Sequence, residues 1–232
     1  MIRQTPPPED SPRRFADLRV TYDLGTLAPE DLTTSPLEAF HGWFAEVEAA
    51  ELPEPNAMVV STASATGAPS SRTVLLKEAD ARGFVFYTNL QSRKSRELAE
   101  NPYASCVFPW FAIHRQIAVV GTAELIDRDE VETYYRSRPR ASRLGAWASA
   151  QSTVIDGRDG LEARYDELLA QYGEHEEIPV PDFWGGWLIR PSAIEFWQGR
   201  PSRLHDRLRF RSIADCADLS KAGDWVLERL SP

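Results

Sequence analysis

The feature that most constrains the fold is a series of short apolar segments separated by turn signals. The first three occupy residues 57–62 (AMVVST), 72–77 (RTVLLK) and 83–88 (GFVFYT), with turn residues at 66–69 and 80–83. Segments rich in β-branched and aromatic residues between such turns are typical of strands joined by tight connections. The pattern therefore predicts an antiparallel meander.

Further strand-like segments continue this pattern towards the C-terminus. Six or more strands with a few helices between them indicate a mainly β protein of the α+β class, a β-barrel with peripheral helices packed on its outside. The later strands are expected near residues 104–108, 116–125, 186–190, 193–197, 204–210 and 225–230.

Four helices are expected from their capping signals. The first follows Ser35, Pro36 and Glu38, which occupy the N-cap, N1 and N3 positions of a capping box. The others are a short helix from Ser92 to Leu98, a helix that starts at a second capping box of Asp127 and Glu130 and ends before Pro139, and a helix over residues 160–172.

Charge and composition exclude several classes of protein. The 232 residues carry a formal net charge of −9, which argues against a general nucleic-acid binder. No apolar run approaches the roughly 18 residues of a membrane-spanning helix, and the N-terminus lacks the apolar core of a signal peptide. The two cysteines, Cys106 and Cys216, fit a reducing compartment and have no CxxC spacing and no metal cluster, so we expect no metal site and a cytoplasmic location.

Basic residues are informative in so acidic a chain. On a regular strand, Arg72 and Lys77 would lie on opposite faces, so that one could bind a phosphate and the other a second ligand. Arg93 and Lys94 follow Ser92 at a helix start, where free N–H groups and the helix dipole favour anions. The alternatives are charges that keep a strand soluble and an exposed helix tip.

A second set of polar residues surrounds Pro139. Tyr134 and Arg138 are four residues apart, on one face of the helix expected there, and Ser142 lies just beyond. A phenol, a guanidinium and a hydroxyl that converge could bind a phosphate, whereas a solvent-facing Tyr–Arg pair is the alternative. Gln151 and Ser152 further on form a polar pair of a kind that commonly occurs in loops.

The densest cluster of this kind begins at Trp197. Arg203, His205 and Arg207 follow it within eleven residues. A guanidinium pairs with phosphate and an indole covers a ring face, so the cluster suits a planar, anionic ligand. An ordinary hairpin whose charged residues face solvent is the alternative.

Motifs of several other enzyme classes are missing from the sequence. It has no glycine-rich dinucleotide fingerprint, no P-loop and no GxSxG nucleophile turn. His41, His114 and His175 have no metal-ligand spacing, and we expect them to be structural.

Taken in order, the motifs resemble the pyridoxine/pyridoxamine 5′-phosphate oxidase family from about Leu18 to the C-terminus. Residues 1–17, which are rich in proline and charge, are then expected to be a flexible segment before one domain over residues 18–232 that includes a C-terminal dimerisation region. The acidic loop at 213–218 departs from the family pattern. The matching motifs are RTVLLK (72–77), FYTN (86–89), SRK (92–94), SRPR (137–140), FWGG (183–186), FWQG (196–199) and RLHDR (203–207).

The resemblance implies a homodimeric, FMN-binding split β-barrel in which both subunits contribute to each site. It implies that FMN is bound by Arg72, Thr73, Val74, Leu75, Leu76, Lys77, Tyr87, Thr88, Arg93, Lys94, Gln116, Gln151, Ser152, Trp197 and Arg207. It implies that the substrate is bound by Lys77, Tyr134, Arg138 and Ser142, by the catalytic residues Arg203 and His205, and by Arg19 and Tyr22 of an N-terminal segment that closes over the site.

The reaction implied is the oxidation of pyridoxine and pyridoxamine 5′-phosphates to pyridoxal 5′-phosphate, as in vitamin B6 biosynthesis. A hydride moves from C4′ of the substrate to flavin N5, and O2 is reduced to H2O2. Two alternatives stay open. A related flavin oxidase acting on another substrate, such as a phenazine precursor, would keep the FMN residues but not the residues that bind the substrate phosphate. A non-catalytic carrier would bind flavin or vitamer without turnover.

Overall fold

The computed structural model describes residues 15, 18, 20–32, 35–173 and 176–232. Arg19, His175 and all of the expected flexible segment except Phe15 lie outside these residues. None of the helices in the described part of the chain is long and apolar enough to cross a membrane.

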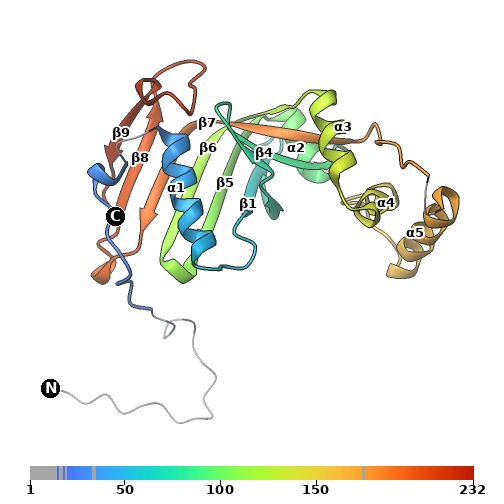
Figure 1. Cartoon of the computed structure of the whole chain (residues 1–232), viewed down its shortest axis with the longest axis horizontal. Coiled ribbons are helices and arrows are strands. Elements are labelled where there is room, and N and C mark those ends of the chain that lie inside the picture. The colour runs from blue at the N-terminus through green and yellow to red at the C-terminus, as the bar shows by residue number, and fades with distance from the viewer. Residues whose placement is uncertain (1–14, 16–17, 19, 33–34, 174–175) are drawn as a thin grey trace, which may run out of the picture.

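A single antiparallel sheet of nine strands dominates the described residues, which confirms the mainly β class with peripheral helices (Figure 1). Its order is β2-β1-β5-β6-β7-β4-β3, and β8 pairs with β7 and then with β9. The strands are β1 (Ala57–Ala63), β2 (Pro69–Leu75), β3 (Glu78–Ala79), β4 (Phe84–Asn89), β5 (Tyr103–Trp110), β6 (Arg115–Leu125), β7 (Trp184–Gln198), β8 (Asp206–Ser212) and β9 (Trp225–Arg229).

The longest strand, β7, replaces two strands that the sequence predicted at 186–190 and 193–197. Pro191, which stands between the two predicted segments, lies opposite Gly121 where the β6–β7 register shifts at Val120/Gly121. A bulge tolerates a residue without an N–H, so the strand continues past the proline. The first half of β7 pairs with β4 and the second half with β8, so one strand joins the two ends of the molecule.

The core lies between the sheet and helix α1 (Pro36–Ala49). The predicted capping box is present: the Ser35 Oγ accepts the Glu38 N–H at 3.3 Å, and the Glu38 carboxylate accepts the Ser35 N–H. Phe40, Trp43 and Val47 of α1 are buried against the sheet. Burial alternates along β1 and β5, so the other face of these strands stays partly exposed.

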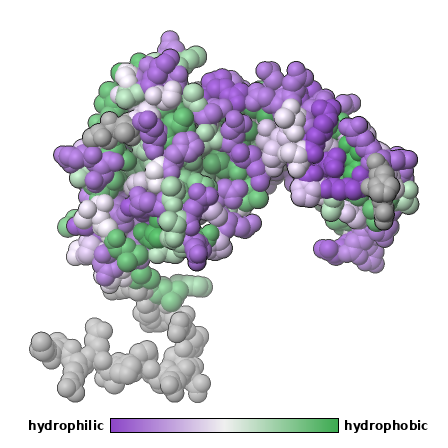
Figure 2. All heavy atoms as spheres, in the orientation of Figure 1, coloured by the Kyte–Doolittle hydropathy of each residue, from purple (hydrophilic) through white to green (hydrophobic). Residues whose placement is uncertain are grey.

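Three further helices form an arm to one side of the sheet (Figure 1). They are α3 (Arg128–Ser137), α4 (Arg140–Ala148) and α5 (Arg158–Tyr172), and Figure 2 shows hydrophilic residues over most of this arm. Helix α4 was not predicted, because Pro139 was read only as the end of a helix. Pro139 also stands at the N-cap of the next helix, immediately before a run of good helix formers.

Two expected caps differ in detail from the structure. Asp127 does precede α3, but its side chain makes no capping hydrogen bond, and the Glu130 carboxylate instead accepts two hydrogen bonds from Arg82 at 2.9 Å. Ser92 precedes α2 (Arg93–Glu100), yet its hydroxyl contacts the Ser95 side chain at 3.4 Å rather than the helix backbone. Local sequence therefore located both helix starts but not the partners of these side chains.

Candidate functional site

A cavity of about 970 Å³ lies between β2, β4, the start of α2 and the helical arm. Among residues 72–77, which were all predicted to bind FMN, only Leu76 does not line this cavity, because its side chain is buried in the core. The cavity brings together fourteen of the predicted residues: Arg72, Thr73, Val74, Leu75, Lys77, Tyr87, Thr88, Arg93, Lys94, Tyr134, Arg138, Ser142, Gln151 and Ser152.

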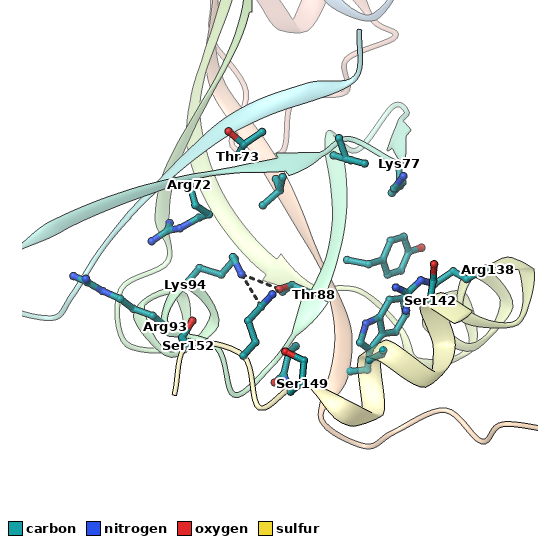
Figure 3. Close-up of a pocket in the computed structure, with 18 of the residues that line it drawn as sticks. Arg72, Thr73, Lys77, Thr88, Arg93, Lys94, Arg138, Ser142, Ser149 and Ser152 are labelled. Atoms are coloured by element: carbon teal, nitrogen blue, oxygen red, sulfur yellow. Dashed lines mark hydrogen bonds between the residues drawn. The ribbon is translucent and has the colours of Figure 1, made fainter. Parts of the chain in front are cut away.

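The cationic side chains of this cavity form two groups. Figure 3 shows Arg72, Arg93 and Lys94 at one end and Lys77 and Arg138 at the other. Two separated positive ends suit a cavity that holds two phosphates, or one long anionic ligand.

Lys94 is the most buried cation at the first end. Its Nζ donates to the Gln151 Oε1 at 2.8 Å and to the Thr88 Oγ1 at 3.0 Å. Burial, with a smaller contribution from Arg72, lowers the pKa of Lys94 to about 8. No carboxylate among the described residues forms an ion pair with Lys94, so the ammonium group is available to a ligand anion.

Arg138 plays the corresponding part at the second end. One terminal nitrogen of its guanidinium is buried with no hydrogen-bond partner, and the group lies 4.8 Å from the Trp184 ring centre. Burial lowers the pKa of Arg138, since no carboxylate offsets the loss of solvation. A guanidinium nitrogen that is buried without a partner beside a cavity indicates an anion site.

The predicted relation between Tyr134 and Arg138 was wrong. Arg138 follows the last residue of α3 and has extended backbone angles (φ −69°, ψ 148°), so the two residues do not share a helix face. Both nevertheless line the cavity together with Ser142 on α4. The turn at Pro139 produces this convergence.

The predicted relation between Arg72 and Lys77 was also wrong. Strand β2 ends at Leu75, and the Lys77 N–H donates to the Val85 carbonyl at 2.9 Å. Because the strand is not regular as far as Lys77, the two side chains line one cavity rather than opposite faces.

Three aromatic rings stack along one wall of the cavity. The Tyr87 and Tyr134 ring centres lie 4.0 Å apart at an interplanar angle of 13°, and the Tyr87 and Trp184 centres lie 5.3 Å apart at 4°. Burial raises the pKa of Tyr87 to about 12, so its phenol stays neutral.

Sequence reasoning did not assign several lining residues to the site. Trp184 was noted only within the FWGG motif, because its place beside Tyr87 depends on the β4–β7 register, which no local signal reveals. The other unassigned lining residues are Ser70, Ser71, Asn89, Pro139, Gly145, Ala146 and Ser149.

The remaining predicted residues gather elsewhere. Gln116, Trp197 and Arg207 pair directly across β6, β7 and β8 and form one row on the sheet. The carboxylate of Glu195 accepts two hydrogen bonds from Arg207, at 2.7 and 2.9 Å, and hydrogen bonding to Glu195 raises the pKa of Arg207.

Aromatic side chains extend this row at the end of β7. The Trp197 and His205 ring centres are 4.7 Å apart, and Tyr22 contacts both rings edge-on. Arg203 lies on the exposed turn between β7 and β8 and has a positive φ of 62°. None of these side chains lines the cavity. Trp184 and Trp197 stand at opposite ends of β7, roughly 40 Å apart along the strand at about 3.3 Å per residue.

Comparison with known proteins agrees with this arrangement. Residues 44–172 match the family model described as pyridoxamine 5′-phosphate oxidase, and residues 184–232 match the one described as the pyridoxine 5′-phosphate oxidase C-terminal dimerisation region. The chain belongs to the pyridoxamine 5′-phosphate oxidase family.

Several relatives in this family match over almost the whole chain. Pyridoxine/pyridoxamine 5′-phosphate oxidase of Salinibacter ruber is 50% identical over 94% of this chain and 99% of its own length. The protein of the same name from Streptomyces avermitilis is 52% identical over 94% of this chain and 96% of its own.

A solved structure supports the fold of this family member. PhzG from Burkholderia lata 383, in complex with tetrahydrophenazine-1-carboxylic acid, superposes with a TM-score of 0.79. It is 32% identical and covers 89% of this chain and 98% of its own.

Proposed function

We propose that the protein is an FMN-dependent oxidase that converts pyridoxine and pyridoxamine 5′-phosphates to pyridoxal 5′-phosphate. The observation that carries the proposal is the cavity with two cationic ends, neither of which has an ion-paired carboxylate on its central cation among the described residues: Lys94 is buried at one end, and Arg138 has a buried, unpartnered guanidinium nitrogen at the other. FMN and the vitamer each bring one phosphate dianion, so their two phosphates match the two ends.

The residues at the first end fit the phosphate of FMN. Arg72, Arg93 and Lys94 supply the positive charge, and the amide of Gln151 is already hydrogen-bonded to Lys94. When bound, the flavin would accept a hydride from the substrate and pass the electrons to O2, which gives H2O2. The other cavity residues proposed to hold FMN are Thr73, Val74, Leu75, Lys77, Tyr87, Thr88 and Ser152, with Leu76 behind them.

The residues at the second end fit the phosphate of the substrate. Arg138 and Lys77 supply charge, and the hydroxyl groups of Tyr134 and Ser142 supply hydrogen bonds. These groups bind a non-reacting part of the substrate and so position the reacting carbon in the cavity.

We propose that a homodimer completes each site. Gln116, Trp197 and Arg207, with Arg203 and His205, lie too far along β7 to reach the cavity of their own chain. The match of residues 184–232 to a dimerisation region and the partly exposed outer face of the sheet support a second copy there. The partner's row would then close the cavity, together with Tyr22 and, outside the described residues, Arg19.

The geometry of His205 suits it to orient a ring. Its Nδ1 accepts the Arg200 N–H at 3.0 Å, so the neutral imidazole carries its proton on Nε2 and can donate from there. Arg203 would hold the substrate ring and stabilise negative charge on it. Hydride transfer between two stacked rings requires few acid–base groups, so these residues act by orientation and electrostatics.

The alternatives predict different activities. PhzG is similar at 32% identity, whereas the relatives named pyridoxine/pyridoxamine 5′-phosphate oxidase are 50% and 52% identical, and the Arg138 end favours a phosphorylated substrate.

The free thiols of Cys106 and Cys216 support the proposed cytoplasmic location.

The test is to load the purified protein with FMN and supply pyridoxine 5′-phosphate in air while aldehyde and H2O2 are followed. We expect both products in equal amounts and no turnover of unphosphorylated pyridoxine at the same concentration. Turnover of a dihydrophenazine carboxylic acid alone would favour the phenazine alternative. Binding of FMN and vitamer without either product would favour a carrier.

A further inference from the structure

A buried carboxylate lies behind the first cationic end and does not line the cavity. Glu97 on α2 is only 6% exposed. Its Oε2 accepts hydrogen bonds from the hydroxyl groups of Thr62 and Ser70, both at 2.5 Å. The side chain is therefore held in one position by neutral donors on two strands.

The same carboxylate contacts two arginines that line the cavity. Its Oε1 accepts the Arg93 Nε at 2.8 Å, and its Oε2 lies 3.5 Å from a terminal nitrogen of Arg72. No other carboxylate of the described residues forms an ion pair with either arginine. Arg72 reaches Glu97 from β2 and Arg93 from α2, so one carboxylate joins arginines of two separate elements.

The negative charge of Glu97 offsets the repulsion among the cations at the first end of the cavity. Arg72, Arg93 and Lys94 are like charges around one end of the cavity. The charge of Arg93 lowers the pKa of Arg72, and the charge of Arg72 lowers the pKa of Lys94. Burial would raise the pKa of Glu97, but hydrogen bonds from Ser70, Thr62 and Arg93 lower it to about 2. The carboxylate is thus ionised at neutral pH and offsets the repulsion among the cations before any ligand binds.

We propose that Glu97 is a positioning residue that holds Arg72 and Arg93 side by side for the phosphate of the flavin. This inference rests on the proposed function, because it assigns that phosphate to the first cationic end. Glu97 does not line the cavity, and it acts by fixing two arginines that do. The hydroxyl groups of Thr62 and Ser70, which donate to Glu97, also accept hydrogen bonds from Arg72 and so belong to the same network.

The test is to compare the affinities of the apoprotein for FMN and for riboflavin, which share every group except the phosphate. In Glu97→Ala, the Kd for FMN should rise by about tenfold to a hundredfold, the usual effect of losing a hydrogen bond to a charged group. The Kd for riboflavin should stay within about twofold, because the ring and ribityl contacts are unchanged. Glu97→Gln keeps the side-chain volume. It should also weaken the preference for FMN over riboflavin, but less than Glu97→Ala does.

Two controls separate positioning from a general structural effect. Glu100→Gln removes the same charge from an exposed position on the same helix and should leave both affinities unchanged. If Glu97 acts through Arg93, Glu97→Gln should cost less FMN affinity in an Arg93→Ala background than in the wild type.

The outcomes are distinguishable. A wild-type protein that does not prefer FMN to riboflavin would overturn the proposed function and this inference with it. A clear wild-type preference that is unchanged or increased in Glu97→Gln, or equal losses of FMN and riboflavin binding in Glu97→Ala, would overturn the inference alone.

Discussion

In the proposed site, the charge of Lys94 determines how strongly the first end of the cavity binds the phosphate of FMN. Burial holds the pKa of its ammonium group at about 8 in the free protein. A bound dianion favours the charged form and must raise that pKa again. The proposed binding of FMN next to Lys94 should therefore be coupled to uptake of a proton above pH 8.

The affinity for FMN should accordingly fall as the pH rises through about 8, by up to about tenfold per pH unit. Quenching of flavin fluorescence between about pH 7 and 9.5 can measure this, because the phosphate stays dianionic above its second pKa of about 6. Lys94→Arg keeps its charge over the whole range and should remove most of the dependence. A wild-type Kd that does not change with pH would contradict the role of Lys94.

Arg138 and Arg203 should differ in what they contribute to the rate. In the proposed site, Arg138 binds a group that does not react, so Arg138→Ala should raise KM for pyridoxine 5′-phosphate and leave kcat largely intact. Loss of one charged partner typically costs about 2–5 kcal/mol. Arg203→Ala should instead lower kcat, by roughly 100-fold if the ring shifts by about 1 Å.

Steady-state kinetics with flavin occupancy measured in parallel can separate these roles. Both variants should retain FMN. Normal turnover in Arg203→Ala, or an unchanged KM in Arg138→Ala, would mean that the roles are assigned wrongly.

At the scale of the elements, the β6–β7 pair depends on one glycine. A Cβ on Gly121 would lie 1.9 Å from the Arg190 carbonyl oxygen, which is backbone and cannot move alone. Gly121→Ala should therefore destabilise the protein by about 3 kcal/mol or more. Gly42 on α1 has nothing within 4 Å of an added Cβ, so Gly42→Ala should stabilise it by about 0.5–1 kcal/mol.

Urea unfolding at one protein concentration measures both changes, and the two substitutions add the same methyl group. Similar midpoints for the two variants would contradict the close approach at the bulge.

Sequence patterns predicted the elements better than their partners. The capping box at Ser35 and the strands β1, β4, β5 and β6 follow from signals within a few residues, and these predictions were confirmed. The strand predicted at 72–77 lies at 69–75 instead, and the predicted meander was wrong, because in the described residues β2 pairs only with β1 while β4 pairs with β7 and β3. The continuity of β7 past Pro191 was missed because a proline usually marks the end of a strand, and only the opposing Gly121 makes a bulge possible.

The same limit applied to the site. The candidate residues could be chosen from their chemistry and from the family resemblance, and many of them line one cavity. The stacking of Trp184 on Tyr87, the contacts of Glu97 and the row through Trp197 depend on strand registers between distant segments. No periodicity within one segment encodes such pairings.

At the scale of the whole molecule, the two groups of site residues lie at opposite ends of β7. The cavity group holds Arg138, whereas the row at the far end of the strand lies next to Arg203. In a symmetric dimer, each chain would supply the first group to one site and the second group to the other site. The two arginines of a working site then come from different chains.

The most direct measurement of this account is complementation between two defective subunits. Arg138→Ala and Arg203→Ala chains with different tags are co-expressed, and the mixed dimer is purified and loaded with FMN. In a composite arrangement, one site collects both substitutions and the other collects none. We predict kcat/KM for pyridoxine 5′-phosphate near half the wild-type value per dimer, far above either parent. A mixed dimer no more active than the average of its parents would show that each site belongs to one chain, and would contradict the account.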